Sequence, residues 1–205
     1  MSVNALICID IQNDFCPGGA LAVADGDAII APVNQMIADA KARGDAIVLT
    51  QDWHPDDHAS FADNHDAATP FDIVEMFYGA QVLWPKHCVR GSAGASFHAN
   101  LDTDHADLVI RKGFRAAIDS YSAFFENDQT TPTGLHGYLQ ARGITKLMMV
   151  GLATDYCVAF SALDGAKLGY DVTVDLGACR AIDLEGSLAR QIEAMRQAGI
   201  TLING

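Results

Sequence analysis

The segment KARGDAIVLT, residues 41–50, joins the end of an amphipathic helix to a short apolar strand. Basic side chains in a last helical turn, followed by glycine, are typical of a helix C-terminus, and the apolar run after the glycine is typical of a buried strand. Because helices that alternate with buried strands form βαβ units, the segment predicts a parallel sheet. The same pattern recurs at Gly143, Gly169 and Gly199, before the apolar runs 147–150, 172–174 and 200–203.

Two further apolar runs, 6–9 and 108–110, bring the expected number of strands to about six. The chain has no internal repeat, low-complexity stretch or change of composition that would divide it. It therefore predicts a single domain over residues 1–205, an α/β fold with a mainly parallel sheet in a three-layer α/β/α sandwich. Apolar side chains at helical spacing mark two of the helices: Ile29, Val33, Met36, Ile37 and Ala40, and Leu184, Leu188, Ile192 and Met195.

Charge and cysteine content narrow the range of partners. A formal net charge of −13 argues against nucleic acid and anionic membrane surfaces. The first residues do not resemble a secretion signal, and no apolar run approaches the ~20 residues of a membrane helix. Five cysteines at irregular spacing do not indicate a disulfide framework. We expect a cytoplasmic protein, a monomer or homo-oligomer, that acts on a small molecule.

A long excursion, at about residues 53–106, separates the second and third expected strands. It is rich in Asp, Pro, Gly and His, and it is longer than a crossover helix requires, so it predicts a pocket wall or lid. It contains six of the seven histidines: His54, His58, His65, His87, His98 and His105.

Four reactive side chains lie at or just after strand ends: Asp10, Asp52, Lys112 and Cys157. Ligands of open α/β sheets bind at the carboxyl ends of the strands, so these groups are expected to converge. Thr154 or Asp155 is expected to cap the next helix, which places Cys157 in its first turn. There the helix dipole and the Lys112 ammonium would favour the thiolate.

These residue types suit the hydrolysis of an amide. Asp10 can take the thiol proton and return it to a leaving amine, while backbone N–H groups of residues 153–157 hold the oxyanion. A buried first-turn cysteine is more often a small apolar residue, and a lone Asp or Lys after a strand is usually a turn or surface residue. Their convergence at one sheet edge favours the functional interpretation for Cys157, whereas Cys8 is expected in the core.

A second group of residues indicates a metal site. Asp52 and His54 are two apart in extended backbone, so their side chains point the same way, and His87 offers a third ligand. Carboxylate with imidazole suits Zn²⁺, Fe²⁺ or Mn²⁺, although a merely polar, histidine-rich surface is the alternative. Nearby, Phe15, Trp84 and Tyr121 are candidates to sandwich a flat ring, or simply core residues.

Taken together, six segments resemble the nicotinamidases, which belong to the isochorismatase-like cysteine hydrolases. The resemblance covers essentially the whole chain, and the order and spacing of the segments make it specific. True isochorismatases lack the nucleophilic cysteine, and carbamoylsarcosine and ureidoacrylate amidases lack the metal ligands. The segments are IDIQNDF (9–15), TQDWHP (50–55), WPKHC (84–88), RKG (111–113), DSYSAF (119–124) and GLATDYCV (151–158).

The resemblance implies a catalytic triad of Cys157, Asp10 and Lys112. It also implies one divalent metal ion, with zinc the first choice, bound by Asp52, His54 and His87. For a further metal contact it leaves two alternatives open, His58 as a ligand or Ser60 through water. In this family Phe15 and Trp84 pack against the substrate ring, and Tyr121 and Ala153 are expected beside them. The N–H groups of Ala153 and Cys157 would form the oxyanion hole, with a cis peptide bond between Leu152 and Ala153.

The implied reaction converts nicotinamide and water into nicotinic acid and ammonia, through a thioester with the cysteine, as a step of NAD salvage. Pyrazinamide is expected as a second substrate. In such enzymes the metal binds the pyridine nitrogen. A metal- or ligand-binding protein without enzymatic activity, on the same fold, is the alternative.

Overall fold

The computed structural model describes residues 3–205. Within them, six strands form one sheet in the order β5-β2-β1-β6-β7-β8, and every neighbouring pair is parallel. The number and direction of these strands agree with the prediction. They are β1 (Val3–Ile9), β2 (Ala46–Asp52), β5 (Leu108–Lys112), β6 (Ile144–Leu152), β7 (Asp171–Arg180) and β8 (Thr201–Ile203).

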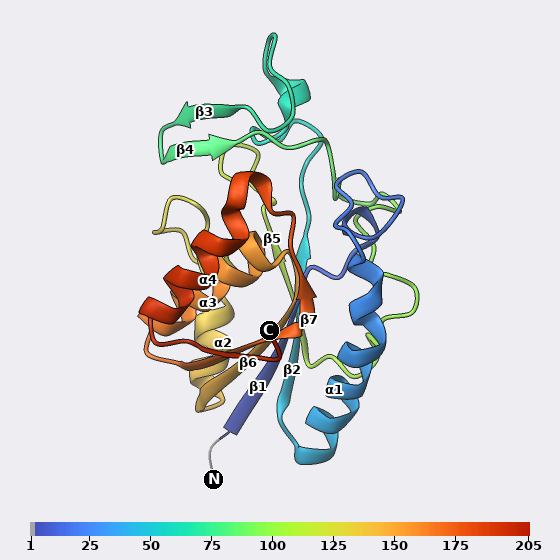
Figure 1. The fold of residues 1–205 in the computed structure, drawn as a ribbon, viewed down its shortest axis with the longest axis vertical. Coiled ribbons are helices and arrows are strands. Elements are labelled where there is room, and N and C mark those ends of the chain that lie inside the picture. Colours follow the sequence, from blue (N-terminus) through green and yellow to red (C-terminus); the bar gives the residue numbers. More distant parts are fainter. Residues whose placement is uncertain (1–2) are drawn as a thin grey trace.

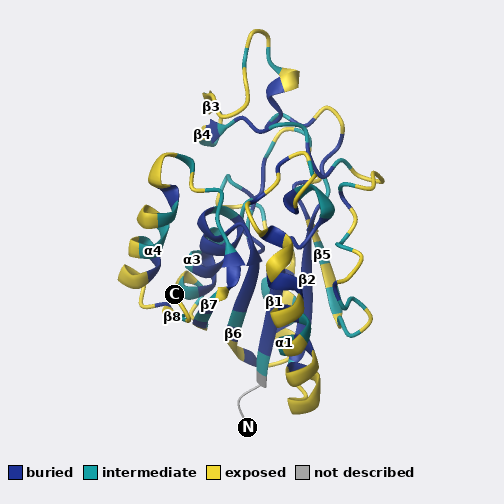
Figure 2. Cartoon of the chain, turned by 45° about the vertical axis from the view of Figure 1, so that its right-hand side comes forward, coloured by how far each residue is buried: buried dark blue, intermediate teal, exposed yellow. Residues whose placement is uncertain are grey.

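Helices cover both faces of the sheet (Figure 1). α1 (Ile30–Arg43) packs on one face, and α2 (Leu135–Ala141), α3 (Ala159–Lys167) and α4 (Ser187–Gln197) pack on the other. Alternate residues of the central strands enter two separate cores: Leu6 packs in the core with α1, and Ile7 in the core with α2 and α3. Figure 2 shows the result, a buried central sheet between helices whose outer faces are exposed. This is the three-layer α/β/α sandwich that the sequence predicts.

The close approach of β1 and β6 depends on Gly151. Its φ is +126°, and a Cβ at this position would lie 2.1 Å from the carbonyl oxygen of Ile9. Such a distance is far inside van der Waals contact, so only glycine fits without movement of the backbone. Asp10 follows β1 directly, so this contact brings it beside the turn that follows β6.

Two local predictions differ from the structure. The strand expected at 172–174 is β7, which is longer and continues to Arg180. Within the excursion, β3 (Ile73–Met76) and β4 (Gly79–Val82) form an antiparallel hairpin that was not predicted. Figure 1 shows this hairpin above the helical layers, beyond the carboxyl ends of the sheet strands. Each of its strands has four residues, too few for a clear alternation of apolar and polar side chains.

The five cysteines are free and buried, Cys8 among them in the core as expected. No helix in the part of the chain from residue 3 onward combines the length and apolar character of a membrane span.

Candidate active site

The ammonium group of Lys112, at the end of β5, lies at the centre of the reactive groups. Its Nζ lies 2.6 Å from Oδ1 of Asp52 and 2.8 Å from Oδ2 of Asp10, and it donates to the Ser120 carbonyl oxygen at 2.8 Å. It also lies 3.4 Å from Sγ of Cys157. All of these side chains are buried, so the carboxyl ends of the strands do bring the predicted acid, base and thiol together.

The two carboxylates next to Lys112 titrate differently. Burial would raise the pKa of Asp52, but Lys112 and His54 together lower it below the ordinary value of 3.8. Burial raises the pKa of Asp10 above 3.8, because Lys112 opposes this shift only in part and the Asp52 charge adds to it. Asp52 is therefore the permanent anion beside Lys112, and Asp10 is the carboxylate better suited to accept a proton.

The expectation of a thiolate at Cys157 is wrong for the protein without substrate. Burial raises the pKa of this thiol well above its ordinary 9.0, and the charges of Asp10 and Asp52 reinforce the effect, against the opposing influence of Lys112. Cys157 is thus a thiol that needs a base. The Asp10 carboxylate lies close to this thiol, and its Oδ1 accepts a hydrogen bond from Thr50 Oγ1 at 2.7 Å.

The expected helix cap is also absent. Cys157 lies in a π-helical turn, Thr154–Val158, whose N-cap residue is Ala153 and which has no side-chain cap. The Asp155 carboxylate instead accepts hydrogen bonds from the backbone N–H groups of Ile182 and Asp183, at 3.0 and 2.8 Å, and from Ser187 Oγ. It therefore ties the cysteine turn to the start of α4.

The peptide bond between Leu152 and Ala153 is cis, as the resemblance implied. The carbonyl oxygen of Ala153 accepts hydrogen bonds from the N–H groups of Tyr156 and Val158, both at 3.1 Å, which fixes the turn. Ala153 and Cys157 line the same pocket.

Asp52, His54 and His87 form a buried group whose ligand atoms lie within 4.8 Å of one another. His54 Nδ1 donates to the carbonyl oxygen of Gly113 at 2.8 Å, and His87 Nδ1 donates to that of Pro85 at 2.7 Å. A carbonyl oxygen only accepts, so each ring carries a proton on Nδ1, and Nε2 is the nitrogen that remains to bind a metal. This backbone support is typical of histidine ligands, and the three residues fit a divalent metal.

His58 and Ser60 lie behind this group. The rings of His54 and His58 are 4.4 Å apart, and His58 Nδ1 lies 2.7 Å from Ser60 Oγ. Burial and the neighbouring His54 lower the pKa of His58 to about 4, so the ring is neutral at pH 7. The other histidines of the excursion have different surroundings; His65, for example, contacts the carbonyl oxygen of Ala59.

A small pocket opens onto Cys157. All four residues expected to bind substrate line it, and Trp84 Nε1 donates to the hydroxyl oxygen of Tyr121 at 3.2 Å. Four of the lining residues were not predicted from the sequence. Two of them, Tyr156 and Asp119, lie in the family-like segments 151–158 and 119–124. The other two, Leu21 and Ile182, lie in no motif that would indicate a site. The lining is Phe15, Leu21, Asp52, His54, Trp84, His87, Asp119, Tyr121, Ala153, Tyr156, Cys157 and Ile182.

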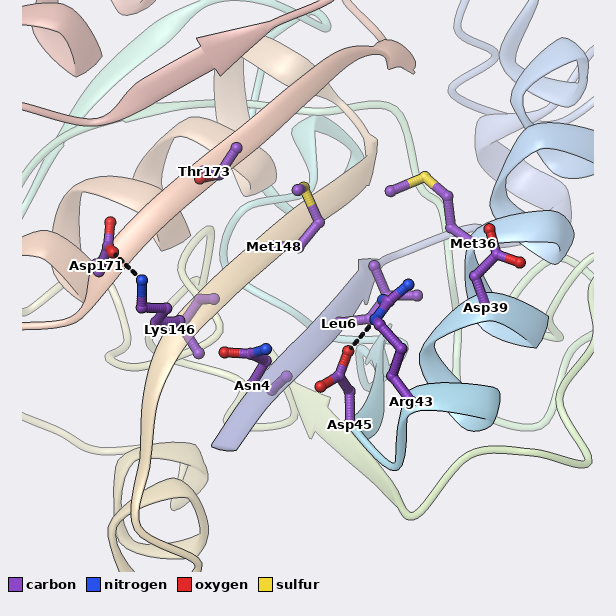
Figure 3. A pocket seen from close by; sticks show the side chains of 12 residues that line it. Asn4, Leu6, Met36, Asp39, Arg43, Asp45, Lys146, Met148, Asp171 and Thr173 are labelled. Carbon is purple, nitrogen blue, oxygen red and sulfur yellow. Dashed lines mark hydrogen bonds and ion pairs between the residues drawn. The ribbon is translucent and has the colours of Figure 1, made fainter. Parts of the chain in front are cut away.

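A second pocket lies at the opposite, amino ends of β1, β6 and β7 (Figure 3). Four of its charged side chains form two ion pairs, Arg43 with Asp45 at 2.7 Å and Lys146 with Asp171 at 3.2 Å. Its lining contains neither cysteine nor histidine. The cysteine and the metal-type residues predicted from the strand ends therefore line the pocket at the carboxyl ends and not this one.

Comparison with known proteins agrees with this arrangement. Residues 4–205 match the family model of the isochorismatase domain. The chain is 51% identical over 200 residues to the nicotinamidase of Acinetobacter baylyi, covering 98% of this chain and 92% of that protein. A solved nicotinamidase and pyrazinamidase structure from Acinetobacter baumanii superposes with a TM-score of 0.95 at 52% identity, covering 99% and 96% of the two chains. A Pyrococcus horikoshii pyrazinamidase structure in complex with zinc has a TM-score of 0.79 at 35% identity, covering 98% and 99%. Since the family model spans nearly all of its residues, the chain belongs to the isochorismatase family.

Proposed function

We propose that this protein is a nicotinamidase, which hydrolyses nicotinamide to nicotinic acid and ammonia and also accepts pyrazinamide. The observation that carries the proposal is the position of Lys112, whose Nζ contacts a thiol and two carboxylates at the base of a pocket lined by aromatic and imidazole rings. The names of the similar proteins support the choice of substrate. The nicotinic acid would enter NAD salvage.

In the first half of the reaction, Sγ of Cys157 bonds to the amide carbon while Asp10 takes the thiol proton. The carbonyl oxygen becomes an anion, which the N–H groups of Ala153 and Cys157 would stabilise. The amide nitrogen then takes the proton from Asp10 as the C–N bond breaks, and ammonia leaves a thioester on Cys157.

In the second half, Asp10 takes a proton from water as the water oxygen attacks the thioester carbon. The C–S bond breaks, nicotinic acid forms, and Asp10 returns the proton to the Cys157 sulfur. Lys112 stays charged throughout, since Asp10 and Asp52 raise its pKa well above the ordinary 10.5, although burial acts in the opposite direction. Its ammonium holds both carboxylates in place and stabilises the sulfur when it is anionic.

Asp52, His54 and His87 would hold one divalent ion. Zinc is our first choice because a homologous pyrazinamidase was solved with zinc, while Fe²⁺ and Mn²⁺ suit the same donors. When bound, this ion supplies a Lewis acid for the pyridine nitrogen of the substrate. Phe15, Trp84 and Tyr121 provide the flat walls for the ring, and His58 and Ser60 are the candidates for a further contact to the metal.

The test is a turnover assay that measures nicotinic acid and ammonia together. We expect stoichiometric formation of both from nicotinamide, no turnover by Cys157→Ala, and poor turnover of benzamide, which has the same shape but no ring nitrogen. Purified, zinc-loaded wild-type protein that leaves nicotinamide and pyrazinamide unchanged would refute the proposal.

A further inference from the structure

Asp119 is a buried carboxylate to which the proposed reaction gives no role. It is 3% exposed and lines the same pocket as His54, His87 and Cys157. One of its oxygens belongs to a group with ring nitrogens of His54 and His58 in which all atoms lie within 4.8 Å of one another. Asp119 therefore faces the metal-type residues from within the pocket.

Neutral groups hold this carboxylate in place. Oδ2 accepts a hydrogen bond from Gln81 Nε2 at 2.9 Å, and Oδ1 accepts one from the Ser120 N–H at 2.8 Å. Gln81 is itself fully buried on β4, where its Oε1 lies 3.2 Å from the Tyr78 hydroxyl and 3.1 Å from Asn127 Nδ2. Because both ends of the Gln81 amide are engaged, Asp119 is oriented and keeps further lone pairs on both oxygens.

Lys112 and, when protonated, His54 are the positive groups of this site, and both lie against Asp52. Asp10, Asp52 and Asp119 are all buried, and the buried ammonium of Lys112 pairs with the first two of them. A buried carboxylate that meets only neutral donors is costly unless a cation is close. A divalent cation beside His54 would supply that partner and would offset the excess negative charge of the pocket.

Among the residues behind the proposed ligands, His58 is less available than Asp119. Its Nε2 lies 3.2 Å from the carbonyl oxygen of Ile118, and its Nδ1 contacts both the N–H of Ser60, at 3.3 Å, and Ser60 Oγ. Binding of a cation by His58 would break one of these contacts. Asp119 needs no such change.

We infer that Asp119, oriented by Gln81, is a further determinant of divalent-cation affinity in this pocket. The Asp119 carboxylate supplies negative charge and acceptor lone pairs on the cation-binding side, and Gln81 fixes its direction from the β3–β4 hairpin. This inference rests on the proposed metal site of Asp52, His54 and His87.

The experiment measures the zinc dissociation constant of metal-free protein by competition with a chromophoric chelator. Asp119→Asn removes the charge and keeps one oxygen to accept the Gln81 hydrogen bond, while the amide nitrogen replaces the oxygen that accepts from the Ser120 N–H. We expect it to weaken zinc binding about 10–100-fold, the usual effect of losing a group that supports a metal site. Asp57→Asn, which removes one charge from an exposed position of the same excursion, is the matched control and should leave the constant unchanged.

Three outcomes separate the inference from the metal site on which it rests. Wild-type protein that binds no zinc, or binds it as tightly as Asp52→Ala does, would refute the metal site. Stoichiometric, Asp52-dependent zinc binding with equal constants for wild type and Asp119→Asn would overturn the role of Asp119 alone. Asp119→Glu, which keeps the charge, should bind zinc more tightly than Asp119→Asn, and the reverse order would contradict the charge argument. Thermal unfolding in excess chelator checks that each variant is folded.

Discussion

Lys112 lies between the two halves of the pocket. One half holds the thiol and its proposed base, and the other holds the metal-type ligands. Its ammonium contacts Asp10 and Cys157 on one side and Asp52, the carboxylate shared with His54, on the other. Cys157, Asp10 and Lys112 are therefore expected to act as one unit rather than as independent contributors.

For this unit we predict that Cys157→Ala abolishes hydrolysis of nicotinamide while the thermal unfolding midpoint stays close to that of wild type. Alanine fills most of the space of a buried thiol and adds no polar group. Asp10→Ala and Lys112→Ala should lower kcat nearly as much. Combining either change with Cys157→Ala should lower kcat hardly any further. Steady-state kcat of the single and double variants measures this, and multiplicative losses in the doubles would contradict the assignment.

The raised pKa of Asp10 predicts the acid side of the pH profile. The base must be ionised to take the thiol proton, so kcat/KM should fall as the pH drops through the folded-state pKa, which burial places above 3.8. The midpoint should therefore lie above 3.8 when zinc is kept saturating. A midpoint at or below 3.8 would contradict the role of Asp10. The same shift means that this group favours folding below 3.8, and that its contribution is lost as the pH rises through the raised pKa.

We predict that Ala153→Pro, which deletes one of the two backbone N–H groups proposed for the oxyanion hole, slows turnover on the order of 10²–10³-fold, the usual effect of losing an oxyanion donor. The φ of Ala153 is −94°, somewhat outside the usual proline range, so thermal unfolding must show that the variant is folded. The change should lower kcat more than it raises KM, because the lost bond strengthens as charge develops. Turnover within a few-fold of wild type, in a folded variant, would show that this N–H is not used.

Among the elements, the pairing of β1 with β6 is the contact on which the site most depends. Gly151 pairs with Ile9, next to Asp10, and begins the segment that leads to Cys157. A side chain there would push the two strands apart and move the base away from the nucleophile.

Gly151→Ala is therefore predicted to lower the free energy of unfolding by at least about 3 kcal/mol, from a strained φ together with a backbone clash. Gly137→Ala is the matched control, because Gly137 lies in α2 with open space around its Cα. It should stabilise the protein by about 0.5–1 kcal/mol through helix propensity. Urea unfolding measures the free energy of unfolding of both variants. Equal changes in the two variants would show that the close β1–β6 contact does not require glycine at position 151.

The elements that the sequence predicts well are those with local signals. The glycines at 44, 143, 169 and 199 all have positive φ and follow helices, as the repeated pattern indicates. The role of Asp155 depends instead on residues 27 to 32 positions away, which no local pattern reveals. For the same reason the direction of the pKa shift of Cys157 could not be predicted. A helix turn and a lysine suggest a lowered pKa, but burial of the thiol among carboxylates raises it.

At the scale of the whole molecule, the pocket brings together residues that are far apart in the chain, from Phe15 to Ile182. The strand-end rule predicts from the sequence alone that Asp10, Asp52, Lys112 and Cys157 meet at one edge, since parallel strands expose the same end there. The wall formed by the excursion is predictable only in outline. Its details, such as the fully buried Gln81, depend on the packing of the hairpin against the pocket.

The position of Lys112 on β5 has a consequence for how the protein loses activity on warming. β5 is at the edge of the sheet, pairs with β2 alone among the described strands, and contains five residues, of which Val109 is 43% exposed. Edge segments of this kind open in local fluctuations that need less free energy than global unfolding. The backbone amides of residues 108–112 should therefore exchange with deuterium faster than those of central β1. Heating should abolish turnover several degrees before the loss of helical circular dichroism, and coincident losses in the two measurements would show that the edge strand opens only with the rest of the molecule.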